Sequence, residues 1–253
     1  MRNIKLVIEY DGTNYHGWQS QRNPLTIQGI LEQAISKVTQ EPITLYGSGR
    51  TDAGVHAQGQ VANFHTQTNI PAANLVHAIN SHLPPDIAIK TATDVTDSFH
   101  ARYSAKSKVY RYTVLNDDTA SPMERLYSWH IRQHLDLQAI RQAASHLIGT
   151  HDFAAFQTKA DRSKDSTRTV YCLRVRRKGH KIYLDIEASG FLYNMVRAIV
   201  GTLVLVGKGF AKPATVRRTL KSRKRSEAGP TAPPQGLCLQ RVKYRSPSLK
   251  RST

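Results

Sequence analysis

Runs of β-branched and aromatic residues alternate with amphipathic segments along this 253-residue chain, and this alternation most constrains the fold. The short apolar runs predict strands at 4–10, 43–49, 60–66, 86–95, 107–115, 166–179, 180–189 and 236–244. Apolar residues recurring every three or four positions predict helices at 26–40, 71–85, 135–149 and 191–209. We therefore expect an α+β fold, with two similar α/β subdomains sharing a largely antiparallel central sheet with flanking helices.

Three divisions of the chain follow from this pattern. Residues 1–105 form the expected N-terminal α/β subdomain, and residues 106–245 form the C-terminal one, which is closed by the strand at 236–244. Residues 246–253 (SPSLKRST) predict a flexible tail.

Local signals refine several of these elements. Pro84 and Pro85 are expected to end the second helix, and the strands at 166–179 and 180–189 are expected to pair as a hairpin across Lys178 and Gly179. The inward side of the third helix is predicted to hold Leu137, Ile140, Ala144, Leu147 and Ile148. The basic run at 221–225 is interpreted as the mobile flank of an ordered loop.

Charge is distributed very unevenly along the sequence. The chain has 36 Lys and Arg against 18 Asp and Glu, a net charge of +18. Residues 1–158 carry 13 basic and 13 acidic side chains, whereas residues 159–253 carry 23 basic and 5 acidic ones. A modest excess would only solubilise the surface, but an excess confined to one region favours a nucleic acid partner. No strongly amphipathic basic helix points to a membrane.

The two cysteines and the N-terminus indicate the compartment. Cys172 and Cys238 are far apart and form no CxxC pair, which argues against a disulfide framework or zinc site and fits a reducing environment. The first apolar run is short and followed by charge, unlike a signal peptide or membrane span. We expect a cytoplasmic protein.

A glycine-rich stretch, YGSGRTDAGVHAQGQ (46–60), holds a single carboxylate, Asp52. An Asp in such a loop is a good turn residue or helix N-cap. However, Arg50 lies close enough to hold the acid ionised, and Gly54 lets a backbone approach a ligand closely. With apolar walls from neighbouring residues, such a carboxylate could act as a nucleophile or a base.

Several sequence blocks resemble the tRNA pseudouridine synthase A family in their order and content. They are EYDGTNYHGWQSQ (9–21), RTDAGVHA (50–57), FHARYSAKSKVYRY (99–112), HDFAAF (151–156), RTV (168–170), FLYNMVRAIVGTL (191–203) and AGPTAPPQGLCL (228–239). The resemblance implies the pseudouridine synthase fold and an isomerase that converts uridine to pseudouridine at tRNA positions 38, 39 and 40. It also implies a homodimer with the anticodon arm running across both subunits.

The same resemblance implies roles for four residues. Asp52 matches the family's nucleophile, Tyr110 the tyrosine that stacks on the target base, and Leu237 the apolar residue that packs against it. Arg197 matches the arginine that pairs with the aspartate, and an Arg in so apolar a helix independently requires an acidic partner. Without the motif, Tyr110 would be interpreted as a strand aromatic and Leu237 as core. Addition at uracil C6, attack at ribose C1′ and a glycal route all remain open.

The remaining site predictions concern RNA binding. A uridine in or beside a stem must be flipped out to reach Asp52. Arg50 is expected to contact the flipped nucleotide's phosphate or orient Asp52, and His56 is a further candidate for substrate binding. Candidate phosphate-binding cations are Lys159, Arg162, Lys164, Arg168, Arg174, Arg176, Arg177, Lys178, Lys181, Lys221, Arg223, Lys224 and Arg225. No metal or organic cofactor is expected, because no HExxH spacing or dinucleotide fingerprint is present.

Two other functions compete with this hypothesis. A tRNA chaperone with a dead site would share the basic half, but it predicts loss of Asp52, Tyr110 or Arg197, and all three are present. A glycosylase would need a second carboxylate close to Asp52. Only Glu9 and Asp11 are candidates for that acid, and only if the fold brings them in.

Overall fold

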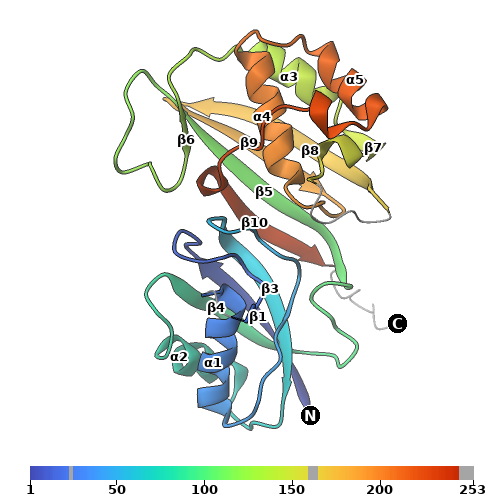
Figure 1. The fold of residues 1–253 in the computed structure, drawn as a ribbon. Coiled ribbons are helices and arrows are strands. Elements are labelled where there is room, and N and C mark those ends of the chain that lie inside the picture. The colour runs from blue at the N-terminus through green and yellow to red at the C-terminus, as the bar shows by residue number, and fades with distance from the viewer. Residues whose placement is uncertain (23–24, 159–164, 245–253) are drawn as a thin grey trace, which may run out of the picture.

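A computed structural model of the chain describes residues 1–22, 25–158 and 165–244. In this part of the chain, ten strands form one sheet in the order β4-β1-β3-β10-β5-β9-β8-β7, with β2 beside β3 and β6 beside β5 (Figure 1). The strands are β1 (Arg2–Tyr10), β2 (Tyr46–Gly47), β3 (His56–Thr66), β4 (Ile87–Val95), β5 (Ala105–Asn116), β6 (Trp129–Ile131), β7 (Gly149–Asp152), β8 (Thr167–Lys178), β9 (Lys181–Ala188) and β10 (Leu237–Tyr244).

Five α-helices flank this sheet in the described residues. They are α1 (Ile27–Thr39), α2 (Ala72–Asn80), α3 (Leu137–Ser145), α4 (Met195–Gly207) and α5 (Ala214–Ser222). Short 3₁₀ turns lie at Ala154–Phe156, Arg225–Glu227 and Pro234–Gly236. None of these helices has both the length and the apolarity needed to cross a bilayer.

The predicted fold class is confirmed. Most strand pairs are antiparallel, the exceptions being β10 with β3 and β5 with β6. In Figure 1, α1 and α2 accompany β1, β3 and β4, whereas α3, α4 and α5 accompany β5, β8 and β9. Buried residues alternate along β9, and Ile182, Leu184 and Ile186 form its buried side as predicted. The division between residues 105 and 106 falls at the start of β5 and stays a prediction.

Strand β10 joins the two halves of the sheet. It pairs in parallel with β3 through Cys238 with His56 and Leu239 with Ala57. Its other edge pairs antiparallel with β5 over its whole length, for example Leu239 with Tyr110. The last described strand of the chain therefore lies in the middle of the sheet, with residues of the N-terminal half on one side and of the C-terminal half on the other.

Helix boundaries differ from the sequence prediction at three places. Helix α4 begins at Met195 rather than 191, because Asn194 before it adopts a left-handed conformation (φ 59°) that interrupts the helix. Helix α2 ends at Asn80, before Pro84, because a hydrogen-bonded turn follows it. Helix α3 ends at Ser145, and Ile148 is exposed rather than inward because the chain turns there into β7.

Other corrections concern turns and the basic run. The hairpin pairs Lys178 with Lys181, so its turn is formed by Gly179 (φ 58°) and His180 rather than by Lys178 and Gly179. Only two residues of the strand expected at 43–49 pair in the sheet. The run at 221–225 includes the end of α5, a helix that the sequence did not indicate because only Val216, Thr219 and Leu220 of it are buried.

The backbone of helix α4 is in direct contact with the backbone of the loop at 228–232. A Cβ added at Gly201 would lie 1.8 Å from the Pro230 carbonyl oxygen, and one at Gly229 would lie 2.7 Å from the Thr202 Cα. The Gly229 N–H also donates to the Thr202 hydroxyl at 2.8 Å. Only glycine at these positions permits so close a contact.

Replacing Gly201 with Ala should lower the free energy of unfolding by about 1–3 kcal/mol, because the new methyl group must displace the loop backbone. This value is the net loss, after the roughly 1 kcal/mol by which Ala is more favourable than Gly within a helix. Urea unfolding followed by circular dichroism measures the change. Gly190→Ala is the matched control, since the nearest atom to its new Cβ lies at 3.6 Å. Equal stability of the two variants would contradict the close packing.

Candidate active site

The loop that carries Asp52 is fixed against the segment following β1. The Thr51 hydroxyl shares a hydrogen bond of 2.8 Å with that of Tyr10, and the Trp18 backbone N–H donates to the Thr51 carbonyl at 3.1 Å. At Gly17 (φ 88°) a Cβ would lie 2.5 Å from the Thr51 carbonyl oxygen. The backbone around Asp52 is therefore held rigidly, although its composition suggests a flexible loop.

Asp52 and Arg197 form an ion pair between the two halves of the molecule. Arg197 Nη1 lies 3.1 Å from Asp52 Oδ2, and the side chain of Arg197 is 15% exposed and that of Asp52 19%. The same Nη1 donates to Asn194 Oδ1 at 2.7 Å, and Nε donates to the Ala232 carbonyl at 2.8 Å. The guanidinium thus has fixed partners besides Asp52, and its orientation does not depend on the carboxylate alone.

Burial dominates the electrostatics of Asp52. The pKa of this carboxyl is raised above its usual value, because the desolvation of its charged form outweighs the hydrogen bond and attraction from Arg197. The acid therefore ionises less readily than an exposed Asp, and its ionised form lacks the full solvation that weakens a nucleophile. A carboxylate in such surroundings is a candidate for covalent or general base chemistry.

Tyr110 lies in β5 with its ring almost entirely buried, at 8% exposure. Its ring meets that of Phe191 edge-on, with centroids 5.1 Å apart. Burial, with smaller effects from Tyr10 and Asp52, raises the pKa of Tyr110 far above its usual value, so the phenol stays neutral. Leu237, at the start of β10, is 5% exposed and pairs with Tyr112.

Arg50 does not pair with Asp52. Its exposed side chain donates from Nε to Gln19 Oε1 at 3.1 Å. Gln19 is in turn bound to Gln28 in α1 at 2.7 Å. The sequence interpretation that Arg50 holds the acid ionised is therefore corrected: Arg197 has that position, and Arg50 points toward the surface.

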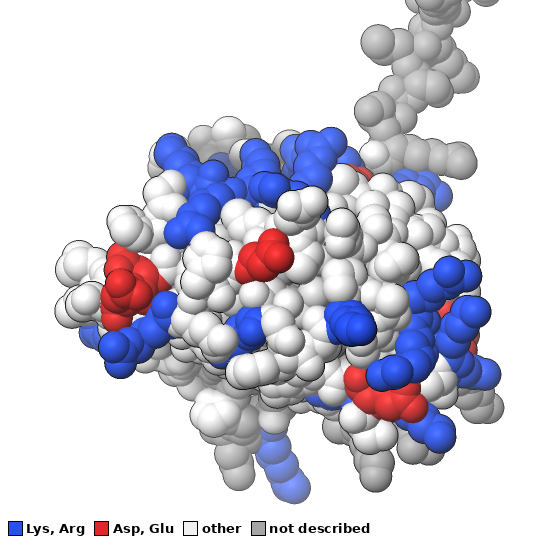
Figure 2. Space-filling view, turned by 90° about the horizontal axis from the view of Figure 1, so that it is seen from above, with Lys and Arg blue, Asp and Glu red and all other residues white. Residues whose placement is uncertain are grey.

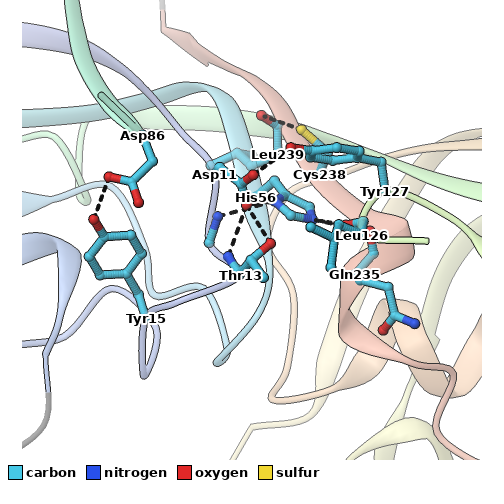
Figure 3. A network of polar contacts seen from close by, with 11 residues as sticks. Asp11, Thr13, Tyr15, His56, Asp86, Leu126, Tyr127, Gln235, Cys238 and Leu239 are labelled. Carbon is cyan, nitrogen blue, oxygen red and sulfur yellow. Dashed lines mark hydrogen bonds and ion pairs between the residues drawn. The ribbon is translucent and has the colours of Figure 1, made fainter. Parts of the chain in front are cut away.

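His56 uses both of its ring nitrogens within the protein (Figure 3). Its Nε2 lies 2.9 Å from the carbonyl oxygen of Leu126 and 3.2 Å from that of Gln235, so Nε2 carries the proton. Its Nδ1 lies 3.1 Å from both the Gly12 nitrogen and Asp11 Oδ1. His56 thus connects the N-terminal half to two segments of the C-terminal half.

The acids that a glycosylase would need have other partners. Asp11 accepts hydrogen bonds from Thr13 and, at 2.6 Å, from the Tyr127 hydroxyl, which lowers its pKa despite partial burial (Figure 3). Glu9 lies 2.9 Å from Lys90. Both line a cavity of about 580 Å³ whose wall does not include Asp52. The described residues therefore provide no second carboxylate in contact with Asp52.

The candidate RNA-binding cations differ in their surroundings. Arg168 lies beside Gly190, with its Nε 3.6 Å from where a Gly190 Cβ would be. Others are paired with acids: Arg176 with Asp185, Lys181 with Glu124 and Arg223 with Asp152. Lys159, Arg162 and Lys164 lie outside the described residues. Figure 2, seen from above, shows a row of Lys and Arg along the upper edge and further groups at the sides, where Asp and Glu lie beside them.

Sequence reasoning missed two residues that shape the site. Asn194 binds Arg197, and Phe191 packs on Tyr110. The position of Asn194 directly before an apolar helix could have indicated its role, because Asn tolerates the left-handed conformation found there. Phe191 had no such signal, because its contact comes from a strand far earlier in the chain.

Arg197→Gln should raise the pKa of Asp52 further, because the variant removes the cation that opposes the effect of burial. Carbon-detected NMR titration of the side-chain carboxyl, assigned with Asp52→Asn, measures this shift. Arg50→Gln is the matched control and should leave the pKa of Asp52 unchanged, since Arg50 binds Gln19 instead. A larger shift of the Asp52 pKa in Arg50→Gln than in Arg197→Gln would show that Arg50, and not Arg197, is the cation that acts on Asp52.

Comparison with known proteins identifies the family. The profile described as tRNA pseudouridine synthase matches residues 6–104 and 143–245. The protein named tRNA pseudouridine synthase A from Thermoanaerobacter sp. (strain X514) is 54% identical over 244 residues, which cover 96% of this chain and 100% of that protein. The one of the same name from Geobacter sulfurreducens is 48% identical over the same shares.

A solved structure, "Crystal Structure of a Cbf5-Nop10-Gar1 Complex", is 11% identical, with a TM-score of 0.38, over 93% of this chain and 57% of that one. A likeness this weak adds nothing to the assignment, which depends on the profile and the curated relatives. Both cover most of the chain, including the loop that carries Asp52 and the helix that carries Arg197. The chain belongs to the tRNA pseudouridine synthase family, whose members are isomerases.

Proposed function

We propose that the protein isomerises uridine to pseudouridine at positions 38, 39 and 40 in the anticodon stem-loop of tRNA, with Asp52 as the nucleophile. One observation carries this proposal: a partly desolvated carboxylate, bound by a fixed arginine, lies at the junction of the two halves. The reaction needs a group that bonds transiently to the substrate and leaves again while the uracil is free to turn, and a carboxylate can do both.

Each residue around Asp52 has a distinct role in this proposal. Arg197 holds the carboxylate ionised and oriented, and its bonds to Asn194 and Ala232 keep it in place when Asp52 reacts. Tyr110 stacks on the uracil as a neutral phenol, since burial strongly raises its pKa. Leu237 supplies an apolar contact for the base. Attack at C6, attack at C1′ and a glycal route all use this arrangement.

The substrate must be presented to Asp52 as a flipped nucleotide, because the carboxylate lies below the surface. We infer that Arg50, exposed two residues before Asp52, contacts the phosphate of this nucleotide. Arg168, beside Gly190, would contact a neighbouring phosphate of the RNA. Exposed cations of β8 and α5, among them Arg177, Lys178 and Lys221, would bind phosphates farther along the arm. His56 would act indirectly, by holding the loop after Asp52 in position.

Asp52→Asn should bind tRNA with wild-type affinity but form no pseudouridine, because Asn is nearly isosteric and cannot serve as an anionic nucleophile. The measurement is pseudouridine formation on transcripts with uridine at 38, 39 or 40, with no metal or cofactor added, alongside tRNA binding. Asp118→Asn, an exposed acid, is the control and should keep full turnover.

The outcomes separate the competing functions. Turnover by Asp52→Asn would refute the assigned nucleophile. Tight tRNA binding with no product from the wild-type protein would favour the chaperone with a dead site. Release of free uracil instead of pseudouridine would favour a glycosylase.

We also propose that the protein acts as a homodimer in the cytoplasm, where its free cysteines stay reduced. A groove of about 470 Å³ on the sheet, lined by charged residues of β5, β8, β9 and β10 such as Arg111 and Asp185, provides a surface that a second subunit could cover. Light scattering should give a molar mass of about twice the 28.3 kDa of the chain. A mass of one chain under conditions of full activity would contradict the dimer.

A further inference from the structure

Three aromatic rings lie together on the surface where strands β2 and β5 begin. His100 lies between Tyr46, at 5.3 Å between centroids, and Tyr103, at 4.4 Å. Tyr46 is 42% exposed and Tyr103 is 76% exposed. We call these three residues the aromatic platform. Two large rings held this open to solvent contribute little to the core, so burial does not account for their position.

The platform is rigid although it is exposed. The Ala101 N–H, between His100 and Tyr103, donates to Asn63 Oδ1 at 2.8 Å, and the Tyr244 hydroxyl donates to the Ala101 carbonyl at 2.8 Å. Asn63 is completely buried. Hydrogen bonds on both sides of Ala101 thus fix the loop, and a ring held in this way loses little conformational entropy when a ligand stacks on it.

Cations border the platform. The Arg102 guanidinium lies 5.8 Å from the centre of the Tyr103 ring. Lys108, near the start of β5, donates from Nζ to the Ser48 carbonyl at 2.6 Å, close to Tyr46 in sequence. Burial, and then the positive charges of Arg102 and Arg168, lower the pKa of Lys108 to about 8. The aromatic rings can stack on the base of a nucleotide, and the cations beside them, which repel one another, can bind its phosphate.

The platform is continuous with the loop that carries Asp52. Tyr46 lies six residues before Asp52, and Lys108 ties the connecting segment to β5. Tyr110 lies five positions after Ala105, which is next to the platform, and this is about 17 Å at the strand rise. A base on the platform is therefore a different base from the one at Asp52, but it can belong to the same short stretch of RNA.

We propose that Tyr46, His100 and Tyr103 form a stacking site for an unpaired RNA base a few nucleotides from the target uridine. This inference rests on the proposed function, since the RNA that presents the target also presents this base. Stacking on an exposed ring holds the loop of the anticodon arm open while the target is flipped. Arg102 neutralises a phosphate beside the stacked base.

The test uses an anticodon stem-loop RNA with 2-aminopurine at successive loop positions, bound to the Asp52→Asn protein. One position should change its fluorescence on binding, and Tyr103→Ala should abolish this change and weaken binding about tenfold, the usual effect of losing one stacked base. Tyr103→Trp should retain both. Phe210→Ala, which removes a ring that is 71% exposed in the segment between α4 and α5, should change neither.

Two further measurements distinguish a base-stacking site from a phosphate contact and from a protein interface. With Asp52 intact, Tyr103→Ala should raise KM about tenfold and leave kcat unchanged, and the dependence of Kd on salt should keep its slope, because no phosphate contact is lost. If Tyr103→Ala binds RNA as tightly as the wild-type protein, the proposal is overturned. A lower molar mass of Tyr103→Ala than of the wild-type protein would also overturn it, because it would identify the platform as a protein interface. If the wild-type protein makes no pseudouridine, the proposed function fails, while the binding measurements still test the platform.

Discussion

The ion pair between Asp52 and Arg197 is the interaction on which the rest of the site depends. One partner comes from a loop of the N-terminal half and the other from a helix of the C-terminal half. Arg197 opposes the effect of burial on Asp52, so without this cation the ionised form of the carboxyl would be still less favoured. The pair exists only when the two halves are docked, so the state of the carboxylate depends on the whole tertiary structure.

Two features hold the halves in that relation. Strand β10 pairs with β3 on one edge and β5 on the other, so backbone hydrogen bonds run through the junction. The loop before β10 packs on α4 at Gly201, and its Ala232 carbonyl accepts the hydrogen bond from Arg197 Nε. The segment that closes the sheet therefore also orients the cation that faces Asp52.

The polar network around His56 and the aromatic platform show how much of the surrounding surface is organised. His56 ties together segments far apart in the chain, at Gly12, Leu126 and Gln235. The loop of the platform is held by the buried Asn63 while its two tyrosine rings stay open to solvent. Rigid support beneath exposed groups is what precise positioning of an RNA loop requires.

The sequence by itself determined the order of most strands and helices, the family and the candidate residues, because periodicity and motifs are local properties. It also required that Arg197 have an acidic partner, since an isolated cation in an apolar helix is too costly. Which cation faces Asp52 was decided only by the tertiary structure: Arg50 is two residues away and points to Gln19, whereas Arg197 is 145 residues away and binds the carboxylate. Likewise, the central place of β10 and the contact of Phe191 with Tyr110 come from strand pairing and helix docking, which join residues whose separation along the chain leaves no local signal.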